Sequence, residues 1–267
     1  MSKIVIFING LPINGKFNET INITENIINK YNNCKIIISY NSYNLIRTVK
    51  SATKNFETRC NEHNNFKNIN EINNKYNTFN IKDYNNWINS IDYKSEKSEN
   101  YYHPQWFLNN LAIDNFITSN NDLNLNDFVF IRIRPDRLDY LDMLIQYTIK
   151  NFSYIQSNNY YFYNGKPICG FNSYVDSYVK DNKIKKELDY ILVNNYNICD
   201  QQNICNYFVL NIFKNFCYNI KSIHNSEKYK TMTEFCKTYT NYDLLVNNET
   251  KLSYYLELNN IKKQYIN

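Results

Sequence analysis

DFVFIRIRPDR, residues 127–137, joins the clearest predicted strand of the chain to its densest group of arginines. The apolar run Phe128–Ile131 predicts a buried strand, and Pro135 ends it because proline lacks the N–H that a sheet ladder needs. The chain has only five arginines among its 30 basic residues, and three of them lie here: Arg132, Arg134 and Arg137. A planar guanidinium can bind phosphate or carboxylate through two hydrogen bonds, which lysine cannot do. The stretch therefore predicts an anion site at the carboxyl end of a strand.

The spacing within this stretch suggests how such a site is built. Residues two apart on a strand point to the same face, so we expect Arg132 and Arg134 to converge on one anion. Asp136 follows as a carboxylate that can bind a metal ion or a sugar hydroxyl. The alternative is a structural network of Arg and Asp that closes the strand end, and the sequence leaves both interpretations open.

Elements on the N-terminal side predict an α/β fold. The run Lys3–Ile8 ends in Asn9-Gly10-Leu11-Pro12, which predicts a buried strand followed by a turn. A helix is expected over residues 20–31 and a second strand over Cys34–Ser39. This β-α-β order predicts a right-handed parallel unit.

The rest of the chain is predicted to complete a core of residues 1–180, with residues 181–267 as a mainly helical part packed on it. Residues 61–100 are rich in Asn, Lys, Glu and Ser, which indicates an inserted variable region. Further elements are expected at 105–118 (buried helix), 127–134 (central strand), 140–149 (helix capped by Asp139), 154–163 and 168–171 (strands), and 207–216 (buried helix).

Composition limits the class of protein. A chain of 267 residues suits one α/β domain, and asparagine makes up about a fifth of it, which we interpret as a coding bias toward AT-rich codons. The net charge of +5 is scattered, so a nucleic-acid interface is not favoured. The seven cysteines form no CxxC motif, and neither a signal peptide nor a transmembrane segment is apparent, so we expect a cytoplasmic protein with reduced thiols.

Three motifs occur in a fixed order: Gly10-Leu11-Pro12 after the first strand, Gln105-Trp106-Phe107 with Leu111 at the start of a helix, and Arg132-Ile133-Arg134-Pro135-Asp136 after the central strand. In this order the chain resembles glycosyltransferase-like proteins of bacterial capsule and lipopolysaccharide loci and of large algal viruses. The resemblance covers about residues 1–180. It implies a GT-A-like α/β fold, a nucleotide-sugar donor and a divalent metal, Mn²⁺ or Mg²⁺; if the chain is viral, its compartment would be the host cytoplasm.

The resemblance also implies site residues. Asn9 and Gly10 would lie near the nucleotide, with Gln105 and Arg132 also at the donor, and Arg134 and Asp136 at the diphosphate, sugar or metal. The chain departs from the family at Leu11 and Ile13, where Gln and Arg are frequent, and it lacks an Asp-x-Asp metal motif after the central strand.

Catalysis in an inverting enzyme of this type needs a carboxylate that deprotonates the acceptor hydroxyl, and Asp176 is the candidate because it follows the turn at Gly170. A solvated aspartate on a helix is the alternative. We therefore expect transfer of a sugar from a nucleotide donor to a glycan or glycoprotein. Two other functions stay open: a catalytically inactive module that binds glycan or nucleotide, and a nucleic-acid-binding accessory protein.

Overall fold

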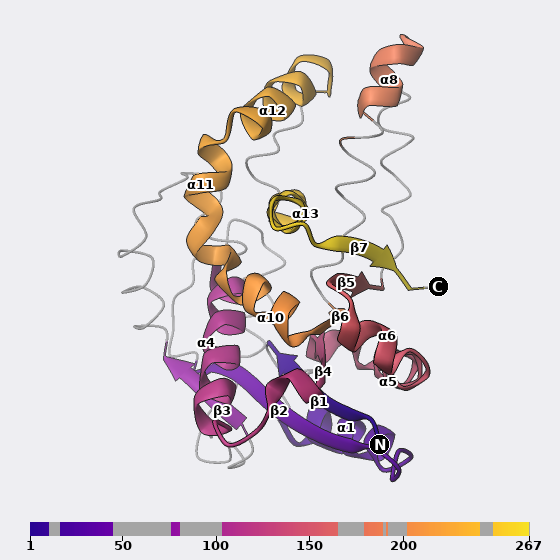
Figure 1. The fold of residues 1–267 in the computed structure, drawn as a ribbon. Helices are drawn as coiled ribbons and strands as arrows, with labels where there is room; N and C mark the ends of the chain where they lie inside the picture. Colours follow the sequence, from indigo (N-terminus) through magenta and orange to yellow (C-terminus); the bar gives the residue numbers. More distant parts are fainter. Residues whose placement is uncertain are drawn as a thin grey trace.

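The computed structural model describes residues 1–10, 17–44, 76–80, 103–164, 179–188, 191, 202–240 and 248–266. Its centre is a mixed, mostly parallel sheet of seven strands in the order β3-β2-β1-β4-β6-β5-β7 (Figure 1). The strands are β1 (Lys3–Asn9), β2 (Lys35–Asn44), β3 (Tyr76–Asn80), β4 (Val129–Ile133), β5 (Tyr160–Tyr163), β6 (Gln202–Asn206) and β7 (Lys262–Tyr265). The α/β class expected from the sequence is confirmed.

Helices cover both faces of the sheet. The described helical segments are α1 (Phe17–Ile28), α4 (His103–Ser119), η3 (Leu125–Asp127), η4 (Pro135–Tyr140), α5 (Leu141–Lys150), α6 (Phe152–Ser157), α8 (Asn182–Leu188), α10 (Tyr207–Lys214), η6 (Asn215–Asn219), α11 (Ile220–Asn225), α12 (Glu227–Thr240) and α13 (Asn248–Leu258). The helices α11 and α12 continue from η6 away from the sheet (Figure 1). No helix in the described ranges has the length and apolarity needed to cross a membrane.

Strand β1 shows why the core has two sides. Its residues from Ile4 to Ile8 are fully buried, and alternate side chains enter opposite layers. Val5 and Phe7 pack with the residues of α4 and α10, whereas Ile4, Ile6 and Ile8 pack with those of α1 and α5. A continuous apolar run is what a central strand covered on both faces requires.

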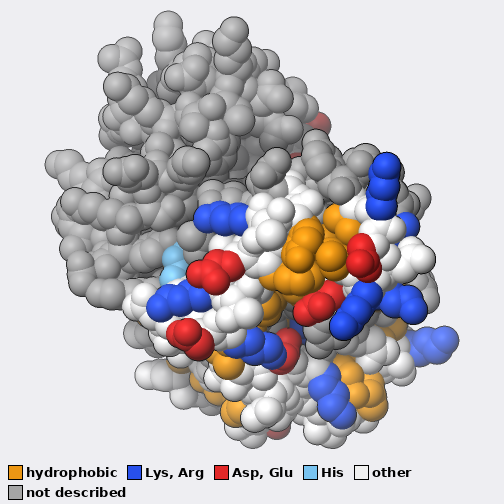
Figure 2. All heavy atoms as spheres, turned by 90° about the horizontal axis from the view of Figure 1, so that it is seen from above, with side chains coloured by type: hydrophobic (Ala, Val, Ile, Leu, Met, Phe, Trp, Pro, Cys, Tyr) orange, Lys and Arg blue, Asp and Glu red, His pale blue; other side chains and the backbone are white. Residues whose placement is uncertain are grey.

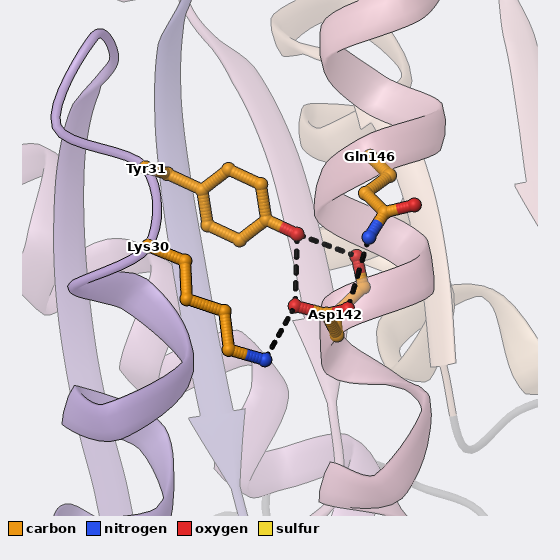
Figure 3. A network of polar contacts seen from close by, with 4 residues as sticks. All are labelled: Lys30, Tyr31, Asp142 and Gln146. Atoms are coloured by element: carbon orange, nitrogen blue, oxygen red, sulfur yellow. Dashed lines mark hydrogen bonds and ion pairs between the residues drawn. The ribbon is translucent and has the colours of Figure 1, made fainter.

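A polar network joins the end of α1 to α5 (Figure 3). The Tyr31 hydroxyl donates to Asp142 Oδ1 at 2.8 Å, Gln146 donates to Asp142 Oδ2 at 2.9 Å, and Lys30 Nζ lies 3.3 Å from Oδ1. The hydrogen bond from Tyr31 is the main cause that holds the pKa of Asp142 below its ordinary value, and burial raises the pKa of Tyr31. These contacts fix α1 against α5 on one face of the sheet.

Several expected elements differ from the structure. Residues 152–157 form α6, so only the end of the strand expected at 154–163 is a strand. The helix α5 has Tyr140 at its N-cap, not Asp139, which lies inside the 3-10 helix η4. Strand β3 lies within the region 61–100 that was expected to be an insertion.

The largest difference concerns the C-terminal region, which was expected to be mainly helical and to pack on the core without strands of the sheet being named in it. Strand β6 inserts between β4 and β5 and is antiparallel to both, and β7 pairs with β5 at the sheet edge. The strand expected at 168–171 lies outside the described residues.

Candidate functional site

Gly10, the described residue of the first motif, lies beside the arginine motif at the carboxyl edge of the sheet. The strands are parallel, with Ile8 opposite Ile133, so Gly10 and Pro135 follow equivalent ends. From β1 the chain proceeds to β2 and β3 on one side and later returns to β4 on the other. This reversal is a topological switch point, where ligands bind in open α/β sheets.

Gly10 is required by its backbone at this place. Its φ of +141° lies in a region that L side chains rarely adopt, and its N–H donates to Asn41 O at 3.0 Å. A Cβ at this position would lie 3.1 Å from Pro135 Cδ. Glycine at position 10 therefore answers a backbone need, and it lies next to Pro135 of the arginine motif.

Arg134 and Asp136 form an ion pair with two hydrogen bonds. Arg134 Nε donates to Asp136 Oδ1 at 3.0 Å, and Nη2 donates to Oδ2 at 2.8 Å. The pair forms because Pro135 begins the 3-10 helix η4 and turns Asp136 back toward the extended Arg134. The side chains remain 26% and 49% exposed, so both charged groups can be reached by a ligand.

Arg132 lies in a different environment. It is 1% exposed, its Nε donates to Asn203 Oδ1 at 2.8 Å, and its guanidinium lies 5.0 Å from the centre of the Phe213 ring. Asn203 lies opposite Arg132 in the antiparallel pair of β4 and β6. The expected convergence of Arg132 and Arg134 on one anion is therefore not seen, because Arg132 is held in the interior by a strand that the sequence did not reveal.

A row of four asparagines crosses the same end of the sheet. Asn77 Nδ2 donates to Asn41 Oδ1 at 3.1 Å, Asn41 Nδ2 donates to Asn9 Oδ1 at 2.8 Å, and Asn9 Nδ2 donates to Asn109 Oδ1 at 2.9 Å. The first three lie in register on β3, β2 and β1, and Asn109 lies on α4. We call these four residues the amide row.

Asn9 was expected at the site, but its three partners were not. In a chain where about a fifth of the residues are Asn, no single asparagine stands out. The available signal was position: Asn9 directly follows a buried apolar strand, and Asn41 follows the end of the run Ile36–Ser39.

Of the remaining expected site residues, the structure describes Gln105 but not Asp176. Gln105 lies on α4, half-buried, about one turn before Asn109. Asp176 and Gly170 lie outside the described residues. Within the described ranges no group of three or more His, Cys, Asp or Glu could hold a metal ion.

Searches with family models, curated proteins and solved structures each found no match to this chain.

Proposed function

We propose that this protein transfers a sugar from a nucleotide-sugar donor to a glycan or glycoprotein acceptor, in a GT-A-like fold. The observation that carries the proposal is the meeting of Gly10 with the Arg134–Asp136 pair at the switch point between β1 and β4. A bare glycine backbone and an accessible guanidinium are suited to a diphosphate. The motif order in the sequence supports the same substrate class.

A divalent metal fits this edge of the sheet when a bound diphosphate supplies part of its oxygen ligands. Mg²⁺ is commonly held by one or two carboxylates together with substrate phosphates, so the single carboxylate of Asp136 is sufficient when a diphosphate supplies further oxygens. Such a metal would neutralise charge that develops on the diphosphate leaving group. For Asp136 to bind it, the Arg134 guanidinium has to turn from Asp136 toward the diphosphate. Asp176 remains the proposed base for the acceptor hydroxyl.

A nucleic-acid accessory role has less support. Figure 2 looks onto the end of the molecule where α8 and α12 lie. On this face, basic side chains are interspersed with acidic ones around a group of hydrophobic side chains. Nucleic-acid binders usually concentrate their basic residues on one face.

A catalytically inactive module that binds the same donor is the second candidate, favoured by Leu11 and Ile13.

Thermal shift with UDP-, GDP- and dTDP-sugars, with and without Mn²⁺, tests the proposal. A donor at 100 times its Kd should stabilise the fold by about 2.7 kcal/mol. Arg134→Lys keeps the charge but loses the two-bonded geometry, and it should weaken donor binding by roughly 1–3 kcal/mol. The matched control is Arg137→Lys in the same turn.

The outcomes separate the three functions. If no nucleotide sugar raises the melting temperature while single-stranded DNA does, the accessory role replaces the proposal. Donor binding without release or transfer of the sugar, measured with a panel of glycan acceptors, would identify the inactive module.

A further inference from the structure

The amide row has a direction. From Asn77 through Asn41 and Asn9 to Asn109, each Nδ2 donates to the Oδ1 of the next residue. The row ends at Asn109 Nδ2, which is buried, in a residue that is 1% exposed, and which has no hydrogen-bond partner in the part of the chain that the structure describes. Chains of hydrogen bonds polarise one another, so the terminal donor should be stronger than that of an isolated amide.

A second donor without a partner lies on the same helix. Trp106 is 2% exposed, and its Nε1 is buried without a hydrogen bond. Residues three apart are neighbours on one side of a helix, so Trp106 and Asn109 lie one above the other on α4. The Trp106 ring packs against Phe213 and Phe216 in the apolar core, so the donor that indicates a missing acceptor oxygen is Asn109 Nδ2, because leaving a buried donor unsatisfied is costly.

The position of the row relates this acceptor to the anion site. Asn9 is the last residue of β1, and continuing the register beyond Ile8 and Ile133 places it opposite Arg134. Adjacent strands are separated by about 4.8 Å, and Asn109 is one hydrogen bond beyond Asn9. An anionic group at Arg134 and an acceptor at Asn109 are therefore close enough to belong to one nucleotide.

We propose that Asn109 Nδ2 recognises a base carbonyl of the nucleotide donor, so that the site selects bases carrying a carbonyl oxygen over bases carrying an amino group at the same position. The inference rests on the proposed function, because the anion at Arg134 is taken to be the donor diphosphate. The ligand places its base against α4, with the carbonyl below the surface where water competes little for the donor.

The hydrogen-bonding groups that stay unpaired at the end of the amide row indicate which type of acceptor fits there. The Oδ1 atoms of Asn109, Asn9 and Asn41 each already accept a hydrogen bond, whereas Asn109 Nδ2 makes none, so the unmet need at the end of the row is that of a donor. A carbonyl oxygen only accepts, whereas a hydroxyl would bring a proton of its own that needs a partner. A phosphate oxygen is disfavoured, because burying a charge beside neutral amides is expensive.

The test compares UDP with CDP, which differ at C4, a carbonyl in uracil and an amino group in cytosine, and at the neighbouring N3, which carries a proton only in uracil. Calorimetry on the full chain should give about a tenfold preference for UDP, the ratio produced by roughly one hydrogen bond of 1.4 kcal/mol. Asn109→Asp keeps an oxygen that accepts from Asn9 and replaces the unpaired donor by an acceptor. This variant should abolish or invert the preference.

Asn110→Asp serves as the matched control. Asn110 is the next residue and is equally buried, but its side chain contacts Lys214 O and the Tyr218 hydroxyl instead of the amide row. It should keep the preference for UDP. If Asn109→Asp does not fold at the assay temperature, Asn109→Ser replaces it, since a hydroxyl either donates or accepts and should bring the UDP to CDP ratio close to one.

Two results would overturn the inference, and they differ in meaning. Binding of both nucleotides with the same ratio in the wild type and in the Asn109 variants removes the role of Asn109 but leaves the proposed function intact. Absence of binding for UDP, CDP, GDP and ADP at millimolar concentration removes both. A preference for IDP over ADP, which differ at C6 and N1 of the purine ring as UDP and CDP differ at C4 and N3 of the pyrimidine ring, would support the carbonyl rule independently of ring size.

Discussion

Gly10 and Pro135 are separated by 125 residues in the chain, yet a Cβ on Gly10 would lie 3.1 Å from Pro135 Cδ. The end of β1 at Gly10 therefore lies so close to the start of η4 that a side chain at position 10 would crowd Pro135. The carboxyl ends of both strands meet here, at the switch point, so the geometry of the candidate site depends on the absence of a side chain at position 10.

Gly10→Ala should therefore destabilise the protein by roughly 1–3 kcal/mol, because alanine at a φ of +141° is strained and its methyl group crowds Pro135. Urea denaturation measures the change in the free energy of unfolding. The change should also lower donor affinity, since relieving the strain moves the end of β1 at position 10 away from Pro135 and Arg134. An alanine variant as stable as the wild type would show that residue 10 has another backbone conformation in solution.

Asn260 provides a contrasting backbone test. It has a φ of 57° after α13, where its N–H donates to Glu257 O at 3.0 Å and the N–H of Ile261 donates to Leu256 O at 2.9 Å, as in a Schellman motif. Asn260→Gly should raise stability slightly and Asn260→Ala should lower it by about 1 kcal/mol, without effect on donor binding. Equal stabilities for the Gly and Ala variants would contradict the left-handed conformation.

The arginines show what the sequence could and could not predict. Their clustering after an apolar strand, together with the proline, was sufficient to place Arg134 and Asp136 beside Gly10. The position of Arg132 in the structure depends on β6, which has the sequence Gln202-Asn203-Ile204-Cys205-Asn206. This segment has neither the alternation nor the β-branched and aromatic content of a typical strand. It is a strand because tertiary partners satisfy its amides: Gln202 Nε2 donates to Asn164 O and Asn203 accepts from Arg132.

The same reasoning applies elsewhere in the fold. Strands β1, β2 and β4 contain apolar runs and were predictable from the sequence. Strand β7, Lys262–Tyr265, is a short edge strand, and its composition does not indicate that it pairs with β5. Residues 152–157 are apolar and aromatic enough for a strand, but Asn151 N–H and Ile155 N–H both bond within local helical turns. Local periodicity could not separate these alternatives in so short a segment.

Arg132→Lys should mainly lower the stability of the free protein, whereas Arg134→Lys should mainly weaken donor binding. Arg132 is buried and hydrogen-bonded, so its replacement should cost about 1.5–3 kcal/mol of stability in the free protein. Arg134 is partly exposed, so its replacement should cost less than about 1 kcal/mol while weakening the donor complex. Chemical denaturation of both variants without ligand checks this. A clear loss of stability in Arg134→Lys with unchanged donor affinity would make Arg134 a structural residue.

The network around Asp142 should make stability depend on pH in the acid range. Its pKa in the folded protein lies below the ordinary value, chiefly because Tyr31 donates a hydrogen bond to the carboxylate. The ionised form is therefore favoured by folding, and this contribution is present above the unfolded pKa of about 3.9 and is lost as the pH falls through the lower folded pKa.

Asp142→Asn should accordingly reduce stability at pH 7 and have progressively less effect as the pH falls below about 4. The loss at pH 7 should stay under about 1 kcal/mol, because the carboxylate is partly exposed and solvent screens it. Urea melts at pH 7, 5 and 3 measure the difference, and Tyr31→Phe, which removes only the hydroxyl, should follow the same trend. A difference between wild type and Asp142→Asn that grows toward acid pH would contradict this assignment.

The described cysteines should differ in their rate of alkylation. Burial raises the pKa of the Cys205, Cys217 and Cys236 thiols to about 12, so almost no reactive thiolate exists at pH 8 and the reagent cannot reach the sulfur without local opening. Cys34 is only partly buried and lies in the turn before β2. Iodoacetamide followed by peptide mass spectrometry should therefore modify Cys34 well before the other three in the native protein, whereas all four should react at similar rates in urea. Early modification of Cys205 under native conditions would mean that β6 opens readily, and Arg132 would then be free to leave Asn203 and approach the ligand beside Arg134.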